Sequence, residues 1–268
     1  MIAEFTGIAA TFPPPFRLLI RETAGSTNDE LRMLAQADAP DGLVLLALQQ
    51  ISGRGRRGAS WLSRPADSLT FSILVRPAET KALWPRLALA AGLAVAEACD
   101  ACGVIAGIKW PNDVWIEQRK VAGILVEAGT DFAVVGIGLN VNGHTLPKEI
   151  AELATSLQIA TTHQQARHTV LGAIIARFAH RRAQIGTGFA ELLDAVRQRC
   201  VLTGQQVSLT TAAGVRQGLI EGLGPGGELL LRTTTGLECL IQADEVRILP
   251  PPNQSVVSLA DRRTKLAP

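Results

Sequence analysis

The chain has 268 residues, enough for one large domain or for one large and one small domain. Hydrophobic residues make up 47% of it, which favours a substantial buried core over disorder. The formal net charge is only +2, so the surface as a whole does not attract nucleic acid, and any strongly positive region must come from local clustering.

Targeting and membrane signals are weak in this sequence. Residues 1–15 lack the basic start and apolar run of a signal peptide. The stretch Leu87–Ala96 carries no polar side chain, but it has about half the length that a membrane-spanning helix needs. We therefore expect a cytoplasmic protein that binds neither membranes nor nucleic acid.

The first half of the chain is expected to combine short strands with two helices. Thr27 and Glu30 fit a capping box ahead of an apolar pattern, so a helix is predicted from near Asn28 to the turn at residues 39–42. Apolar runs predict a long buried helix over Leu83–Ala101. The expected strands are Leu43–Gln49, Leu69–Val75, Ile105–Lys109, Val114–Glu117, Val121–Ala128 and Phe132–Ile137.

The second half begins with helical patterns over Thr162–Ile185 and Phe189–Cys200. From Gly204 the pattern changes to short strands separated by glycine, which is typical of a small β-barrel: Val207–Thr211, Gly218–Leu223, Glu228–Arg232, Leu237–Ile241 and Val246–Leu249. We therefore predict an α+β fold with a mixed sheet over residues 1–203 and a small β domain over 204–250. The polar, proline-containing residues 251–268 are expected to form a flexible tail.

Four cysteines are present, and two of them, Cys99 and Cys102, form a CxxC motif. Such a motif serves redox chemistry or supplies half of a zinc site. No second pair with ligand spacing exists, and this pair lies at the end of an Ala- and Leu-rich helix. We therefore expect Cys99 and Cys102 to be small core residues of a protein in a reducing compartment.

The stretch Gly53–Gly58 places three arginines and three glycines in six residues, with no acid close in sequence. Glycine lets backbone N–H groups turn toward a ligand, and arginine offers forked donors for phosphate or carboxylate. Like charge and backbone entropy predict that this basic loop is mobile when empty. A solvated surface loop is the plain alternative.

Two other functions fit the basic loop poorly. Gly53, Gly55 and Gly58 with Glu79 match a dinucleotide fingerprint, but the residues after Gly58 do not form the helix that the fingerprint requires. Nucleic-acid binding calls for interleaved aromatic residues or a basic helix, and only Trp61 lies near.

Three further motifs could carry chemistry. The turn in Lys109–Asp113 presents a carboxylate beside an amide, which suits magnesium or a metal-bound phosphate, although Asn and Asp also form ordinary turns. Lys120 begins an apolar strand, where it is either a cation aimed into a cavity or a surface lysine. The glycines of Gly136–Asn142 leave room for a flat ligand.

In this order and approximate spacing, the motifs resemble those of the biotin protein ligases, strongly over Arg17–Asn142 and more weakly through Val246 and Arg247. The resemblance implies a biotin/lipoate ligase-like catalytic domain with an SH3-like C-terminal domain. A lipoate–protein ligase, which shares the fold, is the nearest alternative. A non-catalytic binding or scaffold protein is the other, and the intact Lys120, Arg56 and Asp113 argue against it.

The resemblance also implies a role for each motif residue. Lys120, Arg56 and Asp113 would be catalytic, and Asp113 would also serve Mg²⁺. The biotin site would consist of Ser26, Thr27, Asn28, Gln50, Arg54, Gly55, Arg56 and Lys120. The nucleotide site would consist of Arg57, Trp61, Lys109, Asn112, Asp113 and Asn140. One departure is Ala59, where the family often has a basic residue that Arg57 or Arg64 would have to replace.

The implied reaction uses biotin, ATP and Mg²⁺ and has two steps. Biotin is activated as biotinyl-5'-adenylate and is then transferred to a lysine of the biotin carboxyl carrier domain of a biotin-dependent carboxylase. A homodimer is compatible with the resemblance. The 25 residues before Ser26 are too few for a helix-turn-helix, so a monofunctional ligase is expected.

Overall fold

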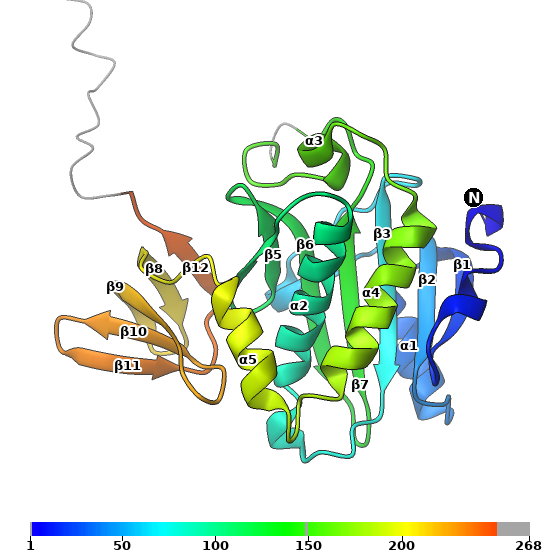
Figure 1. Ribbon diagram of the computed structural model, residues 1–268. Helices are drawn as coiled ribbons and strands as arrows, with labels where there is room; N and C mark the ends of the chain where they lie inside the picture. The colour runs from blue at the N-terminus through cyan, green and yellow to red at the C-terminus, as the bar shows by residue number, and fades with distance from the viewer. Residues whose placement is uncertain (1, 148–149, 251–268) are drawn as a thin grey trace, which may run out of the picture.

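The computed structural model describes residues 2–147 and 150–250. Its centre is a seven-stranded mixed sheet of order β1-β2-β3-β7-β6-β5-β4, in which β1 and β2 run parallel and the other neighbours antiparallel (Figure 1). The strands are β1 (Arg17–Ala24), β2 (Leu43–Gln50), β3 (Ser68–Val75), β4 (Gly107–Lys109), β5 (Asp113–Ile116), β6 (Arg119–Ala128) and β7 (Ala133–Asn140). The predicted mixed sheet is confirmed.

Helices cover both faces of this sheet. Helices α2 and α4 lie side by side on one face, with α5 next to them, and α1 lies on the opposite face (Figure 1). The α-helices are α1 (Thr27–Gln36), α2 (Arg86–Ala101), α3 (Leu157–Thr161), α4 (Arg167–Arg182) and α5 (Phe189–Gln198). The short 3₁₀ turns are η1 (Ile2–Phe5), η2 (Ile8–Thr11), η3 (Arg56–Gly58) and η4 (Lys81–Leu83).

The alternation of side chains along β3 explains where the protein has its core and where it has room for a ligand. Leu69, Phe71 and Ile73 are fully buried in the large hydrophobic cluster that includes α2 and α4. The intervening Thr70 and Ser72 point to the other face, because successive strand residues alternate. Helix α1 covers only part of that face, through a second cluster that includes Leu31. Beyond the N-terminus of α1, the polar face of the sheet is uncovered, and the site described below lies there.

The C-terminal region is a five-stranded antiparallel sheet of order β11-β10-β9-β8-β12. Its core is continuous with that of the large sheet, since Val207 and Leu229 belong to the cluster that contains α2. Trp110 also ties the two sheets together by donating from Nε1 to the carbonyl of Gly227 at 2.9 Å. The predicted small SH3-like β domain is confirmed, with strands β8 (Gln206–Thr211), β9 (Gly214–Leu223), β10 (Leu229–Thr233), β11 (Gly236–Leu240) and β12 (Glu245–Ile248). The predicted tail, 251–268, lies outside the described residues.

Several element boundaries differ from the sequence prediction. The edge strand β1 was not predicted, because only its centre is apolar. The helix expected over Thr162–Ile185 is α4, which begins later, at Arg167, and ends at Arg182. Thr162, with φ of 62°, is instead the C-cap of the short helix α3, which was not predicted. The N-cap of α1 is Ser26, whose Oγ accepts from the backbone N–H of Asp29, rather than Thr27. The hydroxyl of Thr27 is engaged elsewhere, as described below.

Helix α2 is the apolar centre of the fold. By length and composition the segment Lys81–Ala101 could cross a membrane, but 67% of its apolar window is buried inside the protein. Cys99, near the end of α2, is buried, and burial and the neighbouring Cys102 raise the pKa of its thiol to about 12. All four cysteines are free, which agrees with the prediction of small structural residues.

Candidate active site

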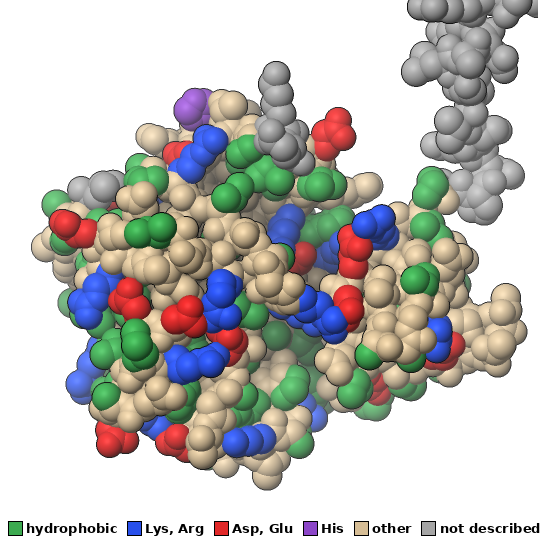
Figure 2. Space-filling view, turned by 180° about the vertical axis from the view of Figure 1, so that it is seen from behind, with side chains coloured by type: hydrophobic (Ala, Val, Ile, Leu, Met, Phe, Trp, Pro, Cys, Tyr) green, Lys and Arg blue, Asp and Glu red, His purple; other side chains and the backbone are tan. Residues whose placement is uncertain are grey.

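A cavity of about 360 Å³ opens on the polar side of the large sheet, a volume within the usual range for small-molecule sites. Its floor is formed by β3, β6 and β7, and its walls by the start of α1, the basic loop and residues Asp244 and Glu245 of the small sheet. Figure 2 shows this side of the molecule, where basic and acidic side chains gather between the large body and the small domain. The cavity therefore lies where the two sheets meet.

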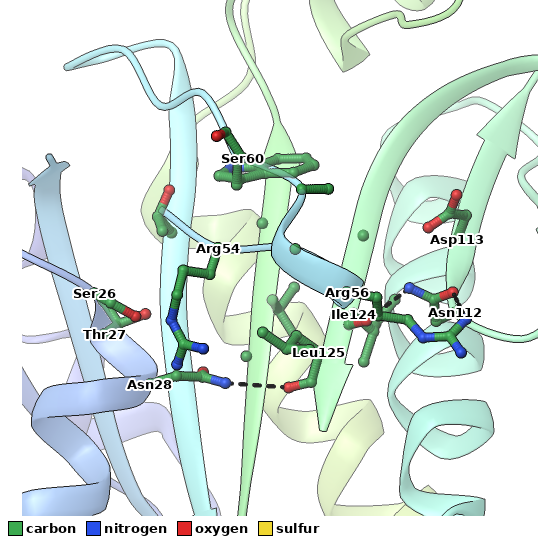
Figure 3. Close-up of a pocket in the computed structure, with 18 of the residues that line it drawn as sticks. Ser26, Thr27, Asn28, Arg54, Arg56, Ser60, Asn112, Asp113, Ile124 and Leu125 are labelled. Atoms are coloured by element: carbon green, nitrogen blue, oxygen red, sulfur yellow. Dashed lines mark hydrogen bonds between the residues drawn. The ribbon is translucent and has the colours of Figure 1, made fainter. Parts of the chain in front are cut away.

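Most of the residues predicted for biotin and nucleotide line this one cavity (Figure 3). They come from the helix start, the basic loop, the turn before β5 and the start of β6: Ser26, Thr27, Asn28, Gln50, Arg54, Gly55, Arg56, Trp61, Asn112, Asp113 and Lys120. Segments almost 100 residues apart in sequence thus converge on one site. Three predicted residues, Arg57, Lys109 and Asn140, are not among its lining residues.

At one end of the cavity, Thr27 is held by a buried polar cluster. Its backbone N–H donates to Gln50 Oε1 at 2.8 Å, and its hydroxyl lies 3.2 Å from the same oxygen. Ser72 Oγ lies 2.8 Å from Thr27 Oγ1 and 2.6 Å from Asn28 Oδ1. Ser72 is fully buried and was missed by the sequence prediction, because a serine within an apolar strand gives no local signal.

The number of hydroxyl protons in this cluster determines which hydrogen bonds it can form with a ligand. Asn28 Oδ1 and Gln50 Oε1 only accept, so the Ser72 proton goes to Asn28 and the Thr27 proton is shared between Ser72 and Gln50. Two hydroxyl protons therefore serve three contacts. The cluster is short of donors, and a ligand that brings an N–H would supply one.

Both polar atoms of the Asn28 amide have hydrogen-bond partners within the protein. Its Nδ2 donates to Glu127 Oε2 at 2.7 Å and to the carbonyl of Leu125 at 3.4 Å, while Oδ1 accepts from Ser72. A Cβ at Gly136 would lie 2.3 Å from Asn28 Oδ1, so only glycine fits at that position of β7. Asn28 thus joins α1 to three strands of the sheet.

The basic loop is paired with acids that are distant in sequence. Arg54 Nη2 lies 2.5 Å from Asp29 Oδ1 and 3.0 Å from Glu127 Oε2. Arg56 donates to Asn112 Oδ1 and to the carbonyl of Ala243, both at 3.1 Å. Carboxylates of the protein therefore pair with Arg54, whose guanidinium was predicted to bind the biotin carboxylate. The predicted mobility of the loop stays a prediction.

Arg56 is half-buried between charges of both signs. Burial lowers the pKa of Arg56, the positive charge of Arg57 lowers it further, and Asp113 and Asp244 act in the opposite direction. The guanidinium nevertheless stays protonated, because an arginine side chain does not lose its proton in proteins near neutral pH. An anion that enters the cavity therefore meets a cation that water solvates incompletely.

Lys120 and Asp113 form an ion pair at the centre of the site. Lys120 Nζ lies 2.8 Å from Asp113 Oδ1, and among the described residues this oxygen has no aligned hydrogen bond. Asn112 next to it donates to the carbonyl of Ile124 at 2.9 Å, which fixes the turn before β5. Lys120 therefore presents a cation into the cavity, as the sequence predicted, rather than on the outer surface.

The flat surface predicted on the glycines of β7 is occupied by a side chain of the protein itself. A Cβ at Gly138 would lie 2.3 Å from Cε2 of Trp61, and one at Gly123 would lie 3.5 Å from Cζ3 of the same ring. The indole therefore rests on the two glycines, and at Gly138 no larger residue would leave room for it. Its Nε1 has no hydrogen-bond partner among the described residues.

The three predicted residues outside the lining have partners of their own. Arg57 pairs with Asp244. Lys109 Nζ lies 4.2 Å from the centroid of the Trp115 ring, and burial lowers the pKa of Lys109 while Asp113 opposes this effect. Asn140 donates from Nδ2 to the carbonyl of Thr155 at 3.0 Å. Arg57, Lys109 and Asn140 therefore each contact another group of the protein rather than the cavity.

Ala59 stands where the resemblance noted above led us to expect a basic residue. It lines the cavity. Of the two arginines considered as substitutes, Arg57 faces Asp244, and Arg64 donates to the carbonyl of Thr145 at 3.2 Å. Neither of them is among the lining residues of the cavity in this state.

The donor set limits the kind of metal that the site could hold. Over residues 2–147 and 150–250, no group of three His, Cys, Asp or Glu residues could enclose a metal ion. Mg²⁺ is commonly held by one or two carboxylates together with substrate phosphates. Asp113, with one buried oxygen that lacks an aligned hydrogen bond, fits that arrangement and does not fit a protein-only cage.

Comparison with known proteins identifies the family. Residues 21–142 match the biotin/lipoate A/B protein ligase family. The chain is 34% identical over 231 residues to a biotin–[acetyl-CoA-carboxylase] ligase of Paracoccus denitrificans, covering 82% of this chain and 95% of that protein. It is 31% identical over 236 residues to the bifunctional ligase/repressor BirA of Bacillus subtilis, covering 85% of this chain and 73% of that protein.

A solved structure agrees with these sequence matches. The biotin protein ligase from Aquifex aeolicus in complex with biotin and ATP superposes with a TM-score of 0.80 at 31% identity, covering 87% of this chain and 99% of that one. The family match includes the basic loop, Lys120 and the glycines of β7. By its sequence, its fold and the residues gathered in its cavity, this chain belongs to the biotin/lipoate A/B protein ligase family, as one of the biotin protein ligases.

Proposed function

We propose that this chain activates biotin with ATP as biotinyl-5'-adenylate and transfers the biotin to a lysine of a biotin carboxyl carrier domain. One observation carries the proposal: a single cavity joins a buried cluster that is short of hydrogen-bond donors to the cations of Arg56 and Lys120. A ligand that fits both ends has N–H donors at one end and an anion at the other. Biotin has its ureido ring and its carboxylate in these places.

In the first step, a carboxylate oxygen of biotin attacks the α-phosphorus of ATP and pyrophosphate leaves. Thr27 and Gln50 hold the ureido ring, and Arg54 exchanges Asp29 and Glu127 for the biotin carboxylate or the adenylate. Lys120 and Arg56 stabilise the charge that builds up on the phosphoryl oxygens, in a site that is partly closed to water. The ion pair with Asp113 orients Lys120 for this role.

In the second step, the acceptor lysine attacks the acyl carbon of the adenylate, the amide forms and AMP leaves. The amine must be neutral when it attacks. The reaction needs no covalent enzyme intermediate, which agrees with a cavity whose functional groups are cations, amides and hydroxyls. Asp113 is the carboxylate nearest to Lys120, and we assign to it the reception of the proton that the amine loses.

Further parts of the proposal concern metal, nucleotide, partners and location. When bound, Mg²⁺ would offset phosphate charge, with Asp113 as its protein ligand. Asn112 and Trp61 would contact the nucleotide. The carrier domain would dock at the mouth of the cavity, with residues 1–203 acting as catalytic domain and 204–250 as the small domain. We place the protein in the cytoplasm, without membrane or nucleic-acid partners, and a homodimer is compatible with this assignment.

The decisive test is detection of the adenylate. The protein is incubated with biotin, ATP and Mg²⁺, and pyrophosphate release and bound biotinyl-adenylate are measured by mass spectrometry. Biotin should support both signals and lipoate should support neither. A signal with lipoate alone would assign the lipoate–protein ligase activity instead, and no pyrophosphate with either acid would leave a non-catalytic binding protein.

A further inference from the structure

The small C-terminal sheet contributes directly to the active site. The link between β11 and β12 carries Ala243 and Asp244, and Asp244 lines the cavity together with Glu245, the first residue of β12. The link is firmly held, because Ala243 is buried and the backbone N–H of Asp244 donates to the carbonyl of Thr210 at 2.8 Å. A fixed carboxylate thus faces the basic loop from a different domain.

The residue that meets this carboxylate has a strained backbone. Arg57 has φ of 55° and ψ of 38°, in the left-handed region that residues with a side chain rarely adopt. Its guanidinium forms an ion pair with Asp244. Strain of this kind persists only where the surroundings hold it. The backbone N–H of Ala59 donates to the carbonyl of Arg56 across this turn, and Asp244 is the acidic partner of the Arg57 side chain.

The same link also touches the neighbouring arginine. Arg56 donates from Nη2 to the carbonyl of Ala243 and from Nη1 to Asn112, both at 3.1 Å. The two adjacent guanidinium groups repel each other, and Asp113 and Asp244 offset this repulsion. Two adjacent arginines are therefore fixed by two adjacent residues of the small domain, and one of them is the cation that points into the cavity.

We propose that Asp244 is a positioning residue that clasps the basic loop: it holds Arg57 in its left-handed conformation and thereby keeps Arg56 over the cavity. The consequence rests on the proposed function: the small domain governs how long the adenylate is retained, although it supplies no group to the chemistry. Arg57, predicted as a nucleotide ligand, acts in this view as the anchor of the loop.

The first test measures the loop without any ligand. Asp244→Asn removes the charge with little change in shape. Its control is Glu221→Gln, which breaks the exposed pair with Arg232 at 2.7 Å within the same small domain. Trypsin cleavage after Arg54 and Arg56 should be about fivefold faster in Asp244→Asn, the size expected for losing a partly exposed ion pair, and unchanged in the control. Equal cleavage in the two variants would overturn the clasp.

The second test restores the pair with its charges exchanged. Arg57→Glu and Asp244→Arg should each speed cleavage after Arg54 and Arg56, and the double variant should recover protection, which a general loss of stability would not do. Biotin labelling of a lysine-rich bystander protein should likewise rise in each single variant and fall again in the double variant. Failure of the double variant to recover would contradict the proposal. A protein that makes no adenylate would refute the proposed function, while the cleavage results would still decide the clasp.

Discussion

The two ends of the cavity are built in opposite ways. At one end Thr27, Gln50 and Ser72 are buried and hydrogen-bonded on the sheet. At the other end Arg57, whose side chain is 47% exposed, is held by an ion pair with Asp244 of the cavity wall. Buried hydrogen bonds are costly to leave unmade and so fix geometry, whereas exposed ion pairs contribute little and exchange easily. The first end suits recognition of a rigid ring, and the second suits a loop that must exchange partners during the reaction.

Lys120 supplies a cation beside Asp113 at the centre of the site, and its removal should give the largest effect. Lys120→Ala is expected to lower the rate of adenylate synthesis by about 100- to 1,000-fold, because one preorganised cation at a developing charge is worth that much. Biotin-dependent pyrophosphate exchange measures the rate. The control is Lys81→Ala, whose exposed side chain lies over Trp84 away from the cavity. Near-normal exchange by Lys120→Ala, with an unchanged Tm, would remove Lys120 from the mechanism.

The hydrogen bonds of the buried end can be removed by substituting Ser72, a residue that does not line the cavity. Ser72→Ala removes the partner of Thr27 and Asn28 and should raise the KM for biotin about tenfold, the value of one buried hydrogen bond. The KM for ATP and kcat should change much less, because Lys120 and Arg56 are untouched.

Ser68→Ala makes the same change on the same face of β3, outside this cluster, and should leave the KM for biotin unaltered. A Ser72→Ala variant that lowers the Tm but binds biotin normally would show that the serine only stabilises the sheet. Recovery of the lower KM in Ser72→Cys, which restores a weak donor and acceptor, would support the positioning role.

At the exposed end, Arg56→Gly should separate synthesis of the adenylate from its retention. The variant is expected to make adenylate at a rate within a few-fold of the parent protein, because Lys120 remains, and to release it early, because glycine cannot grip the phosphate. Streptavidin blotting of an unrelated lysine-rich protein should show several-fold more labelling than with Arg64→Gly, an arginine outside the cavity. Labelling equal to that control would refute the retention role.

The smallest effect should come from salt, which acts on only one of the two ends. Higher ionic strength screens the exposed pairs of Arg54 and Arg57 and should speed trypsin cleavage of the ligand-free loop about twofold. The buried contacts of Thr27 and Ser72 are not screened, so the factor by which Ser72→Ala raises the KM for biotin should stay constant. A factor that changes with the cleavage rate would mean that the two ends are coupled and that the comparison is wrong.

The sequence predicted the parts of the site that consist of neighbouring residues. Ser26 to Asn28, the basic loop and the turn at Asn112 and Asp113 are short motifs, and the structure brings them into one cavity. Local pattern also gave the mixed sheet and the small β domain. The prediction missed β1, because an edge strand with charged ends has little apolar character.

The residues that support the motifs could not be predicted. Ser72 matters because β3 places it behind Thr27, and strand periodicity gives the face of a residue but not its neighbour across the sheet. Glu127 and Asp244 pair with arginines more than 70 residues away in sequence. Such contacts depend on how α1 and the small sheet dock, and no local pattern encodes that docking.

The indole of Trp61 on its glycine floor makes the protein its own optical reporter. The chain contains four tryptophans and no tyrosine, so its ultraviolet emission comes from indole alone and receives no energy from tyrosine donors. Trp84 and Trp110 are buried in the hydrophobic core, whereas Trp61 lines the cavity. A ligand that lifts this ring from Gly138, or covers it, alters the emission of one fluorophore in four. Occupancy of the site can therefore be followed in unlabelled protein, and Trp61→Phe identifies the responsible residue.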